Sequence, residues 1–272
     1  MVRFLDHERF LHRLVENSYR ALDDGAYDIN TAHLGSHDIL SLKKRIVSCP
    51  FVPIIGEIKY RSPSHGILID KKLQASDIAE EMINSGAIAI SVLTQPYEFH
   101  GSLSHLSNIR HKISAPILMK DIVVSDVQVS IARKIGADCI LLIKSVFDNN
   151  LAEGDLEKYI GYANRIGLDA IIEVHTQIEF AESVKLIEGS SNNLIGINNR
   201  DLDTLDVDTS VTSEILTNQS KGKNVVISES GISDPKTIRE LRKVGADGFL
   251  VGTSLVQASN IGRKMEELAQ AI

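Results

Sequence analysis

Several features that would identify common classes of protein are missing from this sequence. It has two cysteines, Cys49 and Cys139, which lie far apart without the spacing of a metal site. It shows no signal peptide and no apolar run long enough to cross a membrane. It has no GxGxxG or Walker sequence, which argues against a nucleotide cofactor, and no tryptophan. We therefore expect a cytoplasmic protein with reduced thiols, no bound metal and no membrane association.

Positive charge, which nucleic acid binding requires, is outweighed by negative charge. The formal net charge is -7, whereas binding to a phosphate backbone calls for a basic face. The one basic run, Lys43-Lys44-Arg45, is short and falls on a predicted helix, where it is best read as a solvated face. We therefore expect no nucleic acid partner.

The chain itself is long enough for a large core. It has 272 residues, of which 43% are hydrophobic, although length alone does not separate one large domain from two. Residues 1–48 read as helical: apolar residues from Phe4 to Leu22 recur at helical spacing, and a second helix is predicted over Asp38–Val47. Cys49-Pro50 ends this section. We expect 1–48 to be a helical extension packed on a domain formed by 49–272.

From Phe51 onward, strand-like and helix-like segments alternate. Two helix starts carry capping-box spacing, Ser125 to Gln128 and Thr176 to Glu179, and glycine recurs at helix-to-strand joints. The predicted strands are 52–58, 87–93, 116–120, 138–143, 169–173, 193–198, 224–229 and 247–251. Eight such βα units in about 220 residues fit a (β/α)8 barrel, an α/β fold, better than a doubly wound sheet.

The stretch Ile54–Gly66 carries the first chemical signal. It reads as a buried strand that ends in a turn, with Glu57 and Lys59 on one face because strand side chains alternate. Taken alone, this pair could equally be a solvated surface ion pair. Its position directly after a buried run instead favours the mouth of a sheet, where α/β folds bind ligands.

Other strands end in polar residues of the same kind. A (β/α)8 barrel has its active site at the C-terminal ends of the strands, so these side chains are expected to converge there. They are Glu57, Lys59, Lys120, Asp121, Lys144, Glu173, His175, Asn198, Asn199, Arg200, Asp201, Glu229, Ser230, Gly231, Gly252, Thr253 and Ser254. Lysines and carboxylates in a partly desolvated mouth suit general acid–base chemistry.

The last two strands indicate how a substrate is anchored. Ser230-Gly231-Ile232 and Gly252-Thr253-Ser254 each precede a predicted helix, so backbone N–H groups and hydroxyls gather there. Each sequence alone is ordinary turn chemistry. Together, after strands seven and eight of one barrel, they favour a phosphate site.

Motifs on seven of the predicted strands, in order, resemble those of the indole-3-glycerol phosphate synthase family. The resemblance runs from about Val52 to the C-terminus. The motifs are Glu57-Ile58-Lys59 with Ser62-Pro63-Ser64 and Gly66; Ser91-Val92-Leu93-Thr94 with Phe99-His100-Gly101-Ser102; Pro116 to Asp121; Ile172-Glu173-Val174-His175; Ile195 to Leu202; Glu229 to Ile232; and Val251 to Ser254.

The resemblance implies a decarboxylating ring closure without a cofactor. In it, 1-(2-carboxyphenylamino)-1-deoxyribulose 5-phosphate becomes indole-3-glycerol phosphate, CO2 and water, a step of tryptophan biosynthesis. Lys120 would be the general acid at the substrate carbonyl and Lys59 would hold the substrate carboxylate or act as an acid in dehydration. Glu57 and Glu173 would act as base or stabilise the cationic intermediate.

The remaining site residues follow from the same resemblance. Asn198 would hold a substrate hydroxyl and Glu229 would belong to the same polar layer. Arg200 would contact substrate or shape its loop, and Phe99 would cover the aromatic ring or pack the loop. Phosphate would be bound by Ser62, Ser230, Gly231, Gly252 and Thr253. Transient contact with neighbouring enzymes of the pathway is also implied.

The sequence departs from the family pattern at a few positions. His65 stands where a lysine is common, Ile122 where an aromatic residue is common, and Ser228 where an alanine is common. None of these changes removes a proposed acid or base. Two alternatives stay open: another phosphate-binding barrel enzyme such as a sugar isomerase, and a non-catalytic barrel that serves as a binding subunit.

Overall fold

The computed structural model describes residues 10–29, 37–63, 66–69 and 73–272. Two sequence-based expectations fall outside these ranges. They concern Phe4 in the first predicted helix and the residues Ser64 and His65 in the turn after the first strand.

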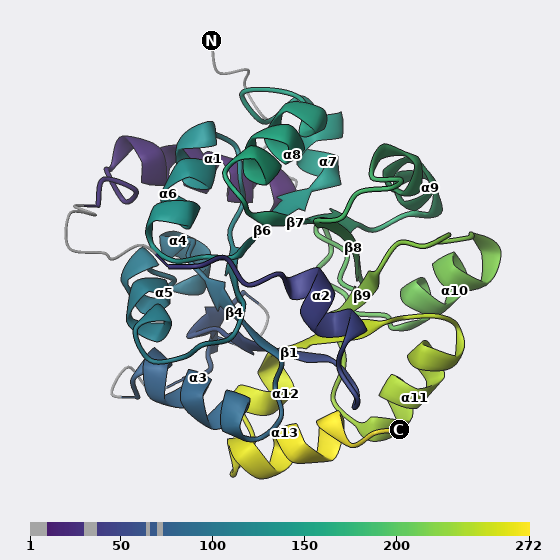
Figure 1. Ribbon diagram of the computed structural model, residues 1–272. Helices are drawn as coiled ribbons and strands as arrows, with labels where there is room; N and C mark the ends of the chain where they lie inside the picture. Colours follow the sequence, from purple (N-terminus) through teal and green to yellow (C-terminus); the bar gives the residue numbers. More distant parts are fainter. Residues whose placement is uncertain (1–9, 30–36, 64–65, 70–72) are drawn as a thin grey trace.

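Within the described part of the chain, eight parallel strands close into a barrel, as the sequence predicts (Figure 1). Closure is made by the first and last strands, which pair from Ile54 opposite Phe249 to Gly56 opposite Val251. The strands are β1 (Ile54–Ile58), β4 (Ala89–Leu93), β5 (Ile117–Lys120), β6 (Cys139–Ile143), β7 (Asp169–Val174), β8 (Asn193–Asn198), β9 (Val226–Glu229) and β10 (Gly248–Val251). They read as near-continuous apolar runs because both faces are covered.

Helices form the outer ring around these strands (Figure 1). They are α3 (Ala75–Asn84), α5 (Leu103–Arg110), α6 (Asp126–Lys134), α8 (Leu156–Arg165), α9 (Gln177–Leu186), α10 (Ser210–Asn218), α11 (Pro235–Lys243) and α13 (Ile261–Ala269). Both predicted capping boxes are present, at Ser125 of α6 and Thr176 of α9. These caps satisfy N–H groups that the first helical turn leaves unpaired and so fix where each strand-end loop stops.

Short elements occupy the strand-end loops, and the sequence analysis did not foresee them. They are the hairpin of β2 (Arg61–Ser62) and β3 (Gly66–Ile67) and the helices α4 (Pro96–Phe99), α7 (Lys144–Asp148) and α12 (Thr253–Val256). Each has five residues or fewer, which is too short for hydrophobic periodicity to reveal.

The N-terminal segment contributes α1 (Phe10–Asp23) and α2 (Leu42–Val47). Helix α2 lies across the near end of the barrel in Figure 1, whereas α1 packs against α4 at a strand-end loop. The prediction of a helix from Asp38 was wrong over 38–41, which are not helical. The Leu40 N–H donates to Asp138 (2.8 Å) and the Ser41 hydroxyl donates to Asp169 (3.0 Å), so distant carboxylates hold this segment outside a helix.

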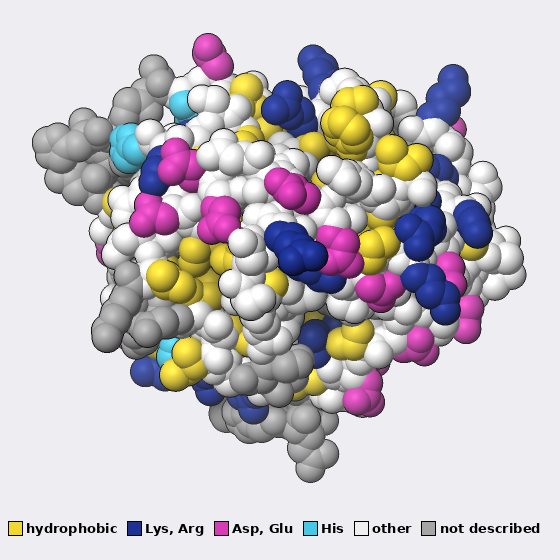
Figure 2. All heavy atoms as spheres, turned by 90° about the horizontal axis from the view of Figure 1, so that it is seen from below, with side chains coloured by type: hydrophobic (Ala, Val, Ile, Leu, Met, Phe, Trp, Pro, Cys, Tyr) yellow, Lys and Arg dark blue, Asp and Glu magenta, His cyan; other side chains and the backbone are white. Residues whose placement is uncertain are grey.

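The surface carries charges of both signs, as the composition of the sequence leads one to expect. On the face in Figure 2, lysine and arginine side chains are interspersed with aspartate and glutamate instead of forming one basic region. None of the helices in the described ranges is both long enough and apolar enough to cross a membrane. Cys49 and Cys139 are both free.

Candidate active site

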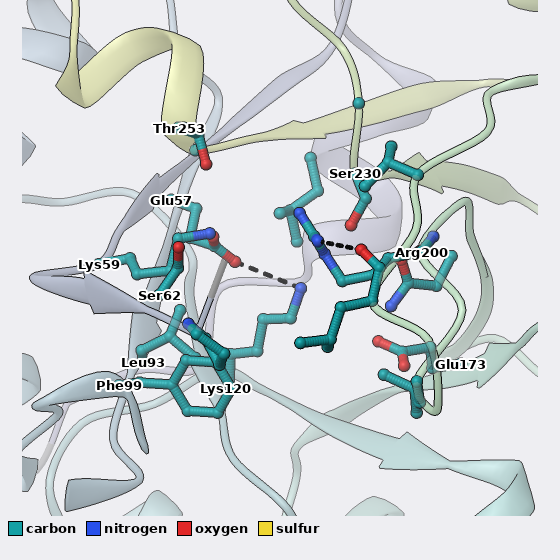
Figure 3. Close-up of a pocket in the computed structure, with 18 of the residues that line it drawn as sticks. Glu57, Lys59, Ser62, Leu93, Phe99, Lys120, Glu173, Arg200, Ser230 and Thr253 are labelled. Carbon is teal, nitrogen blue, oxygen red and sulfur yellow. Dashed lines mark hydrogen bonds and ion pairs between the residues drawn. The ribbon is translucent and has the colours of Figure 1, made fainter. Parts of the chain in front are cut away.

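A cavity of about 440 Å³ opens at the C-terminal ends of the strands. Most of the side chains expected to converge there line it, and Figure 3 shows how those that it labels lie, whereas Glu229, Lys144, His175, Asn199 and Asp201 do not line it. The residues predicted for the site that do line it include Glu57, Lys59, Ser62, Phe99, Lys120, Glu173, Asn198, Arg200, Ser230, Gly231, Gly252 and Thr253. Topology explains this convergence, because parallel strands in a closed barrel all end at the same rim.

Lys120 lies at the centre of the charged layer. Its Nζ is 3.2 Å from Glu57 Oε2 and 2.9 Å from Glu229 Oε2. Lys59 Nζ contacts the other oxygen of Glu57, Oε1, at 2.7 Å. Glu57 therefore bridges two lysines that come from different strands.

These contacts set the charge states of the cluster. Burial opposes the ammonium form of Lys120, but the carboxylates of Glu229, Glu57 and Glu173 outweigh it and raise its pKa above the ordinary lysine value. Burial would raise the pKa of Glu57, but Lys59 and Lys120 outweigh it and lower that pKa to about 2. Lys120 thus holds a proton at neutral pH while Glu57 is ionised.

Two further carboxyl groups behave differently. Glu229 is 0% exposed, and burial raises its pKa to about 7 against the opposing charge of Lys120. Burial also raises the pKa of Glu173, which Lys120 and the Asn198 amide oppose. His175 Nε2 lies 3.5 Å from Glu173 Oε1, so this histidine sits behind the carboxylate. The site therefore holds proton donors and acceptors of different strengths within one layer.

The loops after β9 and β10 form the end of the cavity predicted to take phosphate. Ser230 and Thr253 lie along the same side of the pocket in Figure 3. Ser230 and Gly231 have φ angles of 67° and 79° in succession, so the backbone turns sharply where Gly231 lines the cavity. A Cβ built on Gly252 would lie 2.5 Å from Glu57 Oε1, so a larger residue here would displace that carboxylate.

Apart from Phe99, the apolar wall of the cavity was missing from the sequence-based site. It includes Phe10 and Leu14 of α1, together with Leu93, Phe99 and Ile122. The spacing of Phe10 and Leu14 marks them as one face of a helix, but periodicity cannot say whether that face packs on a core or also borders a cavity. Beside the charged layer, this wall suits a flat aromatic group.

Comparison with known proteins identifies the family. The family model for indole-3-glycerol phosphate synthase matches residues 19–268. The chain belongs to the indole-3-glycerol phosphate synthase family. Its activity is that of a carboxy-lyase of tryptophan biosynthesis.

Curated members of this family match most of the chain. The indole-3-glycerol phosphate synthase of Aquifex aeolicus is 38% identical over 85% of this chain and 86% of its own length. That of Desulforamulus reducens is 35% identical over 89% of this chain and 90% of its own length. A solved thiamine phosphate pyrophosphorylase from Pyrococcus furiosus shares the fold alone, with a TM-score of 0.57, 18% identity and coverage of 81% of this chain and 95% of that one.

Three of the predicted residues differ from the others in their contacts. Glu229 does not line the cavity but contacts Lys120, which does. Arg200 lines the cavity, while its Nη1 donates to the Leu205 carbonyl (2.7 Å) within its own loop. Lys144 contacts Asp148 and Glu182 at 2.8 and 2.7 Å, on a part of the surface that does not line this cavity.

Proposed function

We propose that this barrel mouth closes 1-(2-carboxyphenylamino)-1-deoxyribulose 5-phosphate to indole-3-glycerol phosphate with Lys120 as the general acid. The observation that carries the proposal is the Lys120 ammonium group, held between Glu57 and Glu229 at the floor of a cavity with polar and apolar ends. A raised pKa keeps this lysine protonated, as a donor to a carbonyl oxygen requires.

The substrate has four recognisable parts, and the cavity has matching residues for each. Its phosphate is placed against the loops of Ser230-Gly231 and Gly252-Thr253, with Ser62 beside them. Its aromatic ring is placed on the apolar wall with Phe99. Its carboxylate is assigned to Lys59, and a hydroxyl of the sugar chain to Asn198, whereas Arg200 borders the same space.

The proposed reaction begins with proton donation by a lysine of the charged layer and ends with proton removal by a glutamate. Lys120 protonates the carbonyl oxygen while the ring carbon that bears the carboxylate forms the new C–C bond. The resulting iminium is stabilised by the carboxylates of Glu173 and Glu57, and loss of CO2 returns an electron pair to the ring. A hydroxyl then leaves as water with a proton from an acid, for which Lys59 is the candidate, and Glu57 or Glu173 removes the last proton.

A fluorescence assay tests the role of Lys120. The chain contains no tryptophan, so indole formed from the substrate emits against a tyrosine background alone. We expect Lys120→Ala to lower kcat by about 10²- to 10⁴-fold, because the carbonyl loses its proton donor. Lys236→Ala, at a side chain that is 80% exposed, is the matched control and should retain full activity.

Two results would contradict this proposal. Undiminished indole emission from Lys120→Ala would assign the acid to another residue. Binding of the substrate by the native protein without emission would favour a non-catalytic barrel.

The wider setting is part of the proposal. The family's biosynthetic role and the absence of a membrane-spanning helix in the described ranges support action in the cytoplasm. We place residues 1–48 as an extension of a barrel formed by 49–272, which the contacts of α1 and α2 with barrel elements support. We also propose transient contact with neighbouring enzymes of the pathway.

A further inference from the structure

The backbone at Ser230 adopts a conformation that is unusual for its residue type. Its φ angle is 67°, in the left-handed region that residues other than glycine seldom enter. Ser230 is directly followed by Gly231, with a φ of 79°, and both residues line the cavity. Such a conformation persists where surrounding contacts determine it.

A side-chain amide at the end of the neighbouring strand, β8, holds Ser230 in this conformation. Asn199 Nδ2 donates to the Ser230 carbonyl at 3.0 Å, and the Asn199 backbone N–H donates to the Glu229 carbonyl at 2.9 Å. One residue therefore holds two successive carbonyls of the turn. Because a trans peptide points its C=O and N–H in opposite directions, fixing the Ser230 carbonyl turns the Gly231 N–H to the other side.

Asn199 is in turn fixed by a closed ring of hydrogen bonds. Its Oδ1 accepts from the Thr212 hydroxyl (2.7 Å) and from the Thr212 backbone N–H (3.1 Å). The Thr212 hydroxyl, having donated its proton, accepts from Ser228 (2.8 Å), and the Ser228 hydroxyl accepts from Asn199 Nδ2 (3.1 Å). Asn199 is 1% exposed, and Thr212 and Ser228 are both 0% exposed.

This ring allows the amide only one orientation. A backbone N–H can only donate and a carbonyl can only accept, so Oδ1 must face Thr212 and Nδ2 must face Ser230. Every donor and acceptor of the Asn199 side chain is used, which makes the network rigid.

We propose that Asn199, Thr212 and Ser228 are positioning residues for the substrate phosphate. They hold the Ser230 carbonyl on the side away from the cavity. The Gly231 N–H and the Ser230 hydroxyl are then presented to the anion. The inference rests on the proposed phosphate site. We expect contacts with the phosphate, which lies away from the reacting carbons, to be the same in the ground and transition states; losing such uniform binding raises KM and leaves kcat unchanged.

A matched pair of variants at Thr212 tests the proposal. Thr212→Val keeps the shape but removes the hydroxyl, and Thr212→Ser keeps the hydroxyl. We expect Thr212→Val to raise KM by about 3- to 10-fold with kcat within about twofold, the loss expected for one buried hydrogen bond. The inhibition constant of inorganic phosphate should rise in parallel, and Thr212→Ser should restore both values.

Two further variants distinguish failure of the positioning role from failure of the phosphate assignment. Ser183→Ala removes another 0% exposed serine hydroxyl, on α9, and should change neither KM nor phosphate inhibition. Ser230→Gly keeps the left-handed backbone but removes a hydroxyl of the proposed phosphate site itself. If Ser230→Gly weakens phosphate inhibition but Thr212→Val does not, the positioning role is wrong; if neither does, the phosphate assignment is wrong.

Ser228→Ala provides a milder check should Thr212→Val fold poorly. It opens the ring while leaving the Asn199 contacts with Thr212 and Ser230 in place. We expect a smaller rise of KM, about two- to fivefold, again with phosphate inhibition weakened. A fall in kcat without a change of KM in either variant would overturn the proposal.

Discussion

Asp121, directly after Lys120, is a buried acid with a task separate from proton transfer to the substrate. It is 1% exposed, and its carboxylate accepts from the Tyr27 hydroxyl (2.8 Å), from Thr94 and from the Ile122 N–H (2.8 Å). Burial raises its pKa from 3.8 to about 6, although these three donors oppose the rise. The residue thus ties the N-terminal segment to the end of β5.

This raised pKa predicts how stability depends on pH. The folded state binds the Asp121 proton more tightly than the unfolded state, so its contribution is full below about pH 4 and is lost as pH rises to about 6. The loss amounts to about 3 kcal/mol at 1.36 kcal/mol per pH unit. We expect Asp121→Asn, which stays neutral, to gain that amount relative to the native protein over this range.

Urea unfolding at several pH values measures the difference. Glu173 and Glu229 titrate in both proteins, so subtracting one curve from the other isolates Asp121. A difference that does not vary between pH 4 and pH 6 would show that Asp121 ionises in the folded protein as it does in the unfolded chain.

At the scale of elements, Asp138 joins three segments at the other end of the barrel. It is 0% exposed and accepts from the Leu40 N–H (2.8 Å), Arg110 Nη1 (2.9 Å) and the Ile117 N–H (2.9 Å). We expect Asp138→Ala to lower the free energy of unfolding by about 3–5 kcal/mol, because Arg110 is left as an unpaired buried charge. Urea unfolding checks this, with the 59% exposed Glu240→Ala as the unaffected control.

The same variant should leave catalysis intact. Asp138 precedes β6, and the site lies beyond the strand's other end, about 16 Å away at 3.3 Å per residue. We therefore expect kcat at saturating substrate to stay unchanged below the unfolding temperature. A large fall in kcat would mean that the two ends of the barrel are coupled.

The elements also show what sequence can and cannot predict. The strands were placed within two residues, because buried runs bounded by glycine and caps are local signals. Residues 38–41 were misassigned because Asp138 and Asp169, about 100 or more positions away, decide their conformation. The ring of Asn199, Thr212 and Ser228 was missed for the same reason, since nothing local indicates that three polar residues of separate elements meet.

For the whole molecule, one end of the barrel carries the active site and the other carries the Asp138 contacts. This division predicts that the stabilisation by a bound ligand and the stabilisation by Asp138 add independently. A substrate analogue whose carbonyl is reduced to an alcohol cannot be attacked by the ring, so it binds without turnover. At 100 times its Kd it should stabilise the native protein by about 2.7 kcal/mol. We expect the same increment in Asp138→Ala, since distant sites contribute independently. Calorimetric melting with and without the analogue measures both values; unequal increments would contradict independence.

The anchoring of the N-terminal segment also has a consequence for synthesis on the ribosome. Ser41 binds Asp169, a residue 128 positions later, and Leu40 binds Asp138, 98 positions later. At 5–20 residues per second, roughly 6 to 26 seconds pass between translation of Ser41 and that of its partner. The segment around Ser41 must therefore wait, exposed to chaperones and proteases, until the chain has been made as far as Asp169.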